Sequence, residues 1–131
     1  MRTIRVFEAL RLRRVYRSGV VLALLFANSS AKAVDVDGRA LIYSVGTESC
    51  GHFNAERKAG RDNPYLGWLG GYLSAINRVT PETYDIRGGT DMDGIMLWLD
   101  KYCDSHALDT ISDAVEALVL ELHPRRITKG P

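Results

Sequence analysis

The sequence predicts an all-α domain, a compact bundle of about four helices closed by one disulfide between Cys50 and Cys103. Apolar residues recur at helical spacing in several segments, which is typical of helices with one face in a core. A leader-like segment precedes them and indicates export to an oxidising compartment. The chain has two cysteines, which in such a compartment indicate one disulfide, with two buried free thiols as the alternative.

Residues 1–33 have the pattern of a signal peptide. Arginines precede an apolar run at residues 20–27, and Ala31 and Ala33 provide the small residues that signal peptidase needs. The run is far shorter than the roughly 20 residues of a membrane-spanning helix. We therefore expect cleavage after Ala33 and a periplasmic or secreted protein without a membrane segment. Arg13 and Arg14 suggest twin-arginine export, but the residues after them match that motif poorly, so general secretion is favoured.

Removal of the leader changes the charge balance. The chain has 17 basic and 16 acidic residues, and loss of seven basic residues and one acidic residue leaves ten and fifteen, a net charge of −5. An acidic surface without a basic stripe argues against nucleic acid as a partner. At pH 2 to 3, with the carboxylates protonated and the three histidines charged, the same segment would carry about +13.

The mature chain divides into three segments. Residues 34–46 form an N-terminal segment, residues 47–123 the helical domain, and residues 124–131 a basic tail expected to be mobile. Residues 39–46 suit either one short strand or a turn of helix, and their periodicity does not decide between the two.

The first helix is expected from a cap at Thr47 to about Ala59. It would place Cys50 and Phe53 on one side, and Gly60 would end it.

Asn63 is expected to cap the second helix, with Pro64 at its first position. Its apolar stripe comprises Tyr65, Trp68, Leu69, Tyr72, Leu73 and Ile76. The opposite side is unusual because small residues gather there, and each interior glycine costs a helix about 1 kcal/mol relative to alanine. We expect a close contact on this side, either with another element of the same chain, which is favoured, or with a second chain. The residues of this face are Gly67, Gly70, Gly71 and Ser74.

Two further helices follow a long connection. Thr90 is expected to cap the third, which would carry Cys103 on its core side. Asp109 or Thr110 would cap the fourth, with Leu108 in the position of a hydrophobic staple. The apolar stripes are Met92, Ile95, Met96, Leu99, Tyr102 and Cys103 in the third helix, and Ile111, Ala114, Val115, Leu118, Val119 and Leu122 in the fourth.

No pattern in the chain points to catalysis or to a cofactor. Asp91 and Asp93 are explained by helix capping and lack the spacing of a calcium loop, so neither a metal nor another cofactor is expected. Leu97 and Leu120 fall outside the core stripes and together are candidates for a partner patch. The aromatic residues are assigned to the core, namely Phe53, Trp68, Tyr72, Trp98 and Tyr102.

Several short patterns between residues 50 and 122 resemble one group of secreted proteins. They are Cys50-Gly-x-Phe53, Trp68-x-x-x-Tyr72-Leu73-Ser74, Asp85, Tyr102-Cys103-x-x-His106 and Asp109-Thr110-Ile111-x-x-Ala114. With these patterns in this order along the sequence, the chain resembles the HdeA-type periplasmic acid-stress chaperones. It is also similar to the helical immunity proteins of the Rap/Tai type. The resemblance implies a non-enzymatic protein that binds unfolded clients or a protein partner and often forms a homodimer. The alternative that it implies is an immunity protein that neutralises a secreted toxin.

Overall fold

The structure is a computed structural model that describes residues 34–131, and the predicted signal peptide lies outside them. The chain divides after Ala40, and the two sides are described separately. Before the division, the Asp35 carboxylate accepts hydrogen bonds from the backbone N–H groups of Asp37 and Arg39 and closes a turn. Within residues 34–131 no helix has the length and apolar character needed to cross a membrane.

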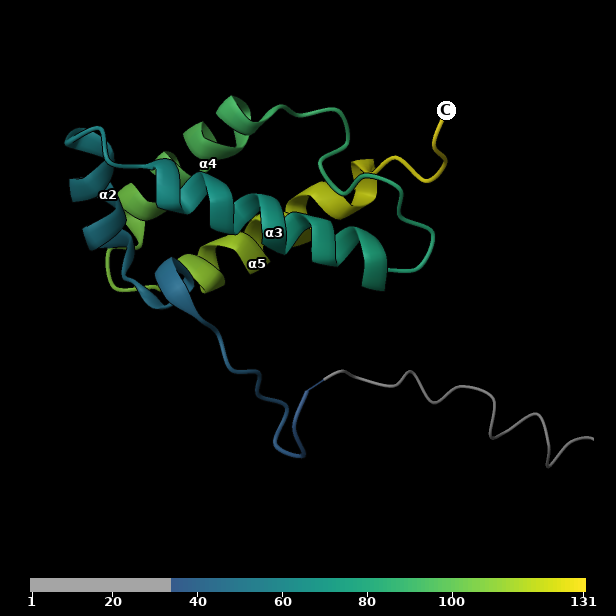
Figure 1. Ribbon diagram of the computed structural model, residues 1–131, viewed down its shortest axis with the longest axis horizontal. Coiled ribbons are helices and arrows are strands. Elements are labelled where there is room, and N and C mark those ends of the chain that lie inside the picture. Colours follow the sequence, from purple (N-terminus) through teal and green to yellow (C-terminus); the bar gives the residue numbers. More distant parts are fainter. Residues whose placement is uncertain (1–33) are drawn as a thin grey trace, which may run out of the picture. The chain divides into compact units, whose positions relative to one another are not determined.

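The second side, Leu41–Pro131, is helical, as predicted. It contains four α-helices, which Figure 1 shows. The described residues contain no strand, only two isolated bridges. Of the stretch at residues 39–46, only residues 44–46 are helical, as the start of a 3-10 turn, and residues 39–43 have no regular structure. The elements are η1 (Ser44–Thr47), α2 (Cys50–Lys58), α3 (Asn63–Val79), α4 (Met92–Ser105), α5 (Ile111–Leu122) and η2 (His123–Arg125).

The starts of α2 and α3 differ slightly from the prediction. Ser49, and not Thr47, caps α2, because its hydroxyl accepts the His52 N–H, whereas the Thr47 hydroxyl donates to a carbonyl inside η1. Asp62 takes the cap position of α3 expected for Asn63. Its carboxylate makes no cap hydrogen bond and pairs with an arginine of α2 instead.

The later helices begin at conventional caps. Asp91, and not Thr90, caps α4 through the Gly94 N–H. Thr110, one of the two predicted candidates, caps α5 in a reciprocal capping box with Asp113. Leu108 is 95% exposed, so the predicted hydrophobic staple does not form.

The caps of α2 and α5 are joined by backbone hydrogen bonds. The Cys50 N–H donates to the Asp109 carbonyl (2.8 Å), and the Ile111 N–H donates to the Glu48 carbonyl (2.9 Å). This bridge places the N-termini of the two helices side by side.

One core lies between the helices. Phe53 and Tyr65 are fully buried and meet edge to face, with ring centroids 5.0 Å apart. Of the aromatic residues assigned to the core, only Phe53 is fully inside, while Trp68, Tyr72, Trp98 and Tyr102 are partly buried around it. The buried apolar residues of this core are Val45, Cys50, Phe53, Tyr65, Leu69, Leu73, Ile86, Ile95, Met96, Leu99, Cys103, Ile111, Ala114, Val115, Leu118 and Leu122.

The C-terminal tail, predicted to be mobile, is docked on the connection between α3 and α4. Ile127 and Asp85 form an antiparallel bridge there. The tail carries few apolar residues, but its backbone forms hydrogen bonds with this connection. Such backbone contacts cannot be predicted from a pattern of side chains.

Candidate functional site

The disulfide predicted from the two cysteines is present. Cys50 begins α2 and Cys103 lies near the end of α4, with Cα atoms 4.7 Å apart and both side chains fully buried. The bond therefore fixes α2 to α4 at one end of the seam between them.

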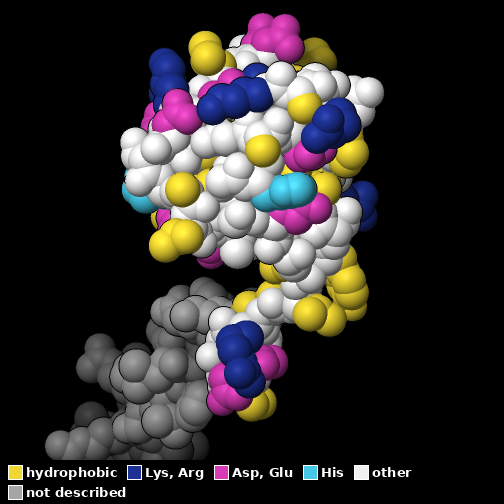
Figure 2. All heavy atoms as spheres, turned by 90° about the vertical axis from the view of Figure 1, so that its left-hand side faces the viewer, with side chains coloured by type: hydrophobic (Ala, Val, Ile, Leu, Met, Phe, Trp, Pro, Cys, Tyr) yellow, Lys and Arg dark blue, Asp and Glu magenta, His cyan; other side chains and the backbone are white. Residues whose placement is uncertain are grey.

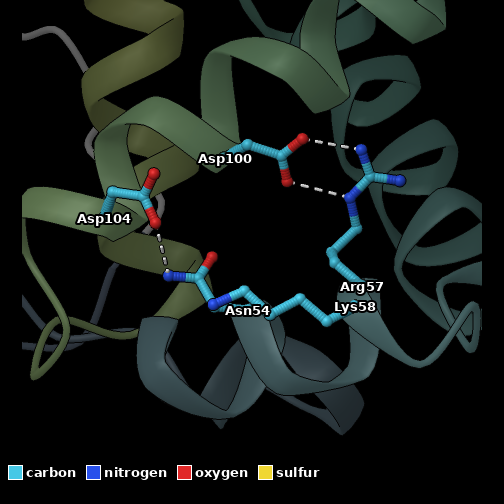
Figure 3. A pocket seen from close by; sticks show the side chains of 5 residues that line it. All are labelled: Asn54, Arg57, Lys58, Asp100 and Asp104. Atoms are coloured by element: carbon cyan, nitrogen blue, oxygen red, sulfur yellow. Dashed lines mark hydrogen bonds and ion pairs between the residues drawn. The ribbon is translucent and has the colours of Figure 1, made fainter.

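Polar side chains line the same seam, as Figure 3 shows. The Arg57 guanidinium of α2 donates two hydrogen bonds to the Asp100 carboxylate of α4, at 2.8 and 2.7 Å, and also contacts Asp62. The hydrogen bonds to Asp100 raise the pKa of Arg57 above its usual range, against the opposing effect of burial. Asn54 donates to Asp104 at 3.2 Å. These contacts hold the two helices together beyond the disulfide.

The seam opens into a hollow of about 360 Å³ lined by Asn54, Arg57, Lys58, Asp100 and Asp104. Its polar groups mostly bond to one another, and Figure 3 shows Arg57 turned toward Asp100 and Asn54 toward Asp104. The lining includes no serine, cysteine or histidine side chain that could act as a nucleophile or general base. Residues 34–131 also contain no group of three His, Cys, Asp or Glu side chains placed to hold a metal ion. We regard this hollow as part of the structural seam.

The glycine face of α3, formed by Gly67, Gly70, Gly71 and Ser74, is open. A Cβ added at any of its three glycines would meet no atom within 4 Å, so no other described part of the chain crosses this face. The favoured expectation of a close contact within the chain is therefore wrong for residues 34–131. The Ser74 hydroxyl donates to the Gly70 carbonyl at 2.6 Å, which directs its polar group along the helix.

Other glycines of the fold have a clear structural reason. A Cβ at Gly46 would lie 2.3 Å from the Trp68 ring, and one at Gly88 would lie 2.5 Å from the Arg125 carbonyl oxygen. Such distances are far below van der Waals contact, so these positions require glycine. The glycines of α3 have no such requirement within the described chain, which makes their face the candidate functional surface.

Three aromatic rings stack in a row along α4, which was not predicted from the sequence. Tyr102 lies between Trp98 and His106, with ring centroids 5.3 and 4.2 Å away. Trp98 also donates to Glu121 of α5, and the Tyr102 hydroxyl donates to Asp109. The spacing of four residues on one helix could have indicated this row. Because the rings cover one another's faces, they offer little flat surface to a ligand.

The surface viewed from the α2 side carries lysines and arginines interspersed with aspartates and glutamates, and its apolar side chains are scattered (Figure 2). Leu97 and Leu120, the candidates for a partner patch, are 55% and 76% exposed on α4 and α5.

Comparison of the chain with protein-family models, curated proteins and solved structures finds no match. The assignment of a functional surface therefore depends on the geometry described above.

Proposed function

We propose that the mature chain is a non-enzymatic periplasmic binding protein of the HdeA-like group, chaperone-like in action, that holds a protein client on the glycine face of α3. The buried disulfide is compatible with a periplasmic or extracellular location. The proposal is supported by the open glycine face, where an added Cβ at any of the three glycines would meet no other element of the described chain within 4 Å.

The glycine face suits contact with another polypeptide. A helix without side chains on one side lets a second backbone approach closely, as small residues do at packed helix interfaces. Three interior glycines also cost α3 about 1 kcal/mol each relative to alanine. A close partner would provide the physical reason for that cost, which the fold of the single chain does not.

The first experiment tests the face itself. Gly70→Leu adds a side chain whose Cβ meets nothing in the single chain, and Ala55→Leu adds a similar bulk at an exposed position of α2. Binding to reduced, carboxymethylated α-lactalbumin, a permanently unfolded polypeptide, would be measured at pH 7 and pH 2.5. We expect Gly70→Leu to weaken binding at least tenfold and Ala55→Leu to leave it unchanged. Equal binding by both variants would reject the face as the site.

The second experiment tests the function. Light scattering would give the mass of the mature protein at pH 7 and pH 2.5, with a dye that reports exposed apolar surface. A neutral dimer that dissociates and binds the dye in acid supports an acid-stress chaperone. A particle that is unchanged over this range and binds no unfolded polypeptide would overturn the proposal in favour of an immunity protein with a constitutive partner.

A further inference from the structure

The residue Glu48 joins three segments of the fold near the start of α2. Its carboxylate accepts a hydrogen bond from the hydroxyl of Tyr65 in α3 and lies 3.6 Å from the Nε2 atom of His52 in the first turn of α2. Its backbone carbonyl accepts the N–H of Ile111, the first residue of α5, at 2.9 Å. We call Glu48, His52 and Tyr65 the Glu48 cluster.

Tyr65 holds the Glu48 carboxylate in place. Tyr65 is 2% exposed, and its ring packs edge to face on Phe53, so its hydroxyl has a fixed position. Burial and the hydrogen bond to Glu48 raise the pKa of Tyr65, which keeps this hydroxyl protonated as the donor. A carboxylate that is already fixed loses less side-chain entropy on pairing with His52 than a freely rotating glutamate would.

The other carboxylates around the start of α2 have partners of their own. Glu56, one turn after His52, is bonded to an arginine, and His52 acts on it only as a nearby charge. Asp113 of α5 is bonded in the capping box, and Asp109 of the preceding loop accepts from a tyrosine of α4. Within residues 34–131, Glu48 is therefore the one carboxylate within 4 Å of a nitrogen of His52.

The pairing of a histidine with a carboxylate depends on pH in two opposite ways. A histidine gains its charge as the pH falls from about 8 to 5. A glutamate loses its charge below about pH 4. Both groups are charged and attract each other only between these limits. In strong acid the charge of His52 remains in the first turn of α2, where a positive charge is unfavourable.

We propose that the Glu48 cluster is a pH-dependent contact that fastens the start of α2 to α3 and α5 most tightly near pH 5 and less tightly at neutral pH and in strong acid. Mild acid would thus make this part of the fold more rigid before strong acid loosens it. The cluster is separate from the glycine face of α3, so this proposal does not depend on the proposed function.

The test measures hydrogen exchange of the Ile111 amide, whose acceptor is the Glu48 carbonyl, in the mature chain by NMR. Protection factors at pH 7.5, 5.0 and 2.5 would be compared with that of Leu118 in the same helix. We expect the protection of Ile111, relative to Leu118, to be about threefold higher at pH 5.0 than at pH 7.5, as one partly exposed ion pair allows. It should fall again at pH 2.5.

Three variants assign the rise to the cluster. His52→Gln and Glu48→Gln each remove one charge of the pair, so both should abolish the rise between pH 7.5 and 5.0. His123→Gln is the matched control, because within the described residues its side chain has no carboxylate within 4 Å, and it should keep the rise.

No rise in the unchanged chain, or a rise that persists in His52→Gln, would overturn the proposal. If Glu48→Gln fails to fold, His52→Gln decides the result, since that side chain is 54% exposed and its loss disturbs no core contact. None of these outcomes depends on whether the chain binds an unfolded polypeptide, so the proposed function is tested separately.

Discussion

The seam between α2 and α4 and the outer face of α3 belong to one small fold but differ in how their residues find contacts. At the seam the disulfide and the paired side chains of Arg57, Asp100 and Asn54 use most of the polar groups within the chain. On the glycine face of α3, a Cβ added at Gly67, Gly70 or Gly71 would meet no other element of the described chain within 4 Å. The first region is explained by the fold, whereas contacts within the described chain give no reason for the glycines of the second. The difference predicts opposite responses to mutation.

The largest expected effect is at the disulfide. Replacing both Cys50 and Cys103 by serine releases a loop of about 54 residues, which in the chain-entropy model lowers the free energy of unfolding by about 4 kcal/mol. Urea denaturation with and without the bond would measure this loss. A loss below about 1 kcal/mol would show that the side-chain contacts of the seam, and not the bond, hold α2 to α4.

The next effect is at the ion pairs of the seam. Arg57→Ala leaves Asp62 and Asp100, whose side chains are 26% and 30% exposed, without their shared partner. Because charged hydrogen bonds are lost while their partners stay partly buried, we expect a loss of about 2 kcal/mol in the free energy of unfolding. Arg125→Ala is the matched control, since the side chains of Arg125 and its partner Glu121 are 61% and 54% exposed and their pair should contribute well under 1 kcal/mol. Equal losses in the two variants would contradict the assignment of the seam as the structural region.

On the glycine face, a substitution is expected to stabilise the fold instead of destabilising it. Gly70→Ala meets nothing and improves helix propensity, so it should raise the free energy of unfolding by about 1 kcal/mol. Gly46→Ala, whose added Cβ would lie against the Trp68 ring, should lower it by about 1 to 3 kcal/mol. Thermal unfolding at low protein concentration would compare the two. Destabilisation by Gly70→Ala would show that the face is covered after all.

The smallest effect concerns pH. Hydrogen bonds from Thr110 lower the pKa of Asp113, and hydrogen bonds from Arg87 lower that of Asp85. A carboxylate whose pKa is lower in the folded state stabilises the fold above its unfolded pKa of about 4, and this contribution is lost as the pH falls through the folded value.

Asp113→Asn should therefore lower the free energy of unfolding by up to about 1 kcal/mol at pH 5 and by less at pH 2.5. Denaturation at the two pH values would measure the change. An equal loss at both would mean that the charge of Asp113 is not involved.

The sequence was sufficient to predict the features of the fold that follow from the spacing of side chains, namely the helices and the disulfide. Helical periodicity located all four helices, and the cysteine count predicted the disulfide. The caps of α2, α3 and α4 were missed by one or two positions because several neighbouring residues could serve. Hydrogen bonds decided between Thr47 and Ser49. Leu108 suited a staple by position, but no apolar residue covers it.

Two features could not be predicted because they depend on contacts between distant segments. Main-chain hydrogen bonds dock the tail, and any extended sequence offers the same groups. The glycines at residues 67, 70 and 71 were evident as an anomaly, but spacing alone could not show whether another element lies over them. The structure shows that no described element does.

The bridge between the caps of α2 and α5 has an electrostatic consequence. Each helix N-terminus carries a partial charge equivalent to about +0.5, and the bridge holds two of these poles together. Asp113 in the capping box and Glu48 just before α2 place negative charge beside them. The helix poles arise from the backbone and do not titrate, whereas carboxylates do. Acid therefore removes the charge of Asp113 and leaves the two positive dipole ends side by side.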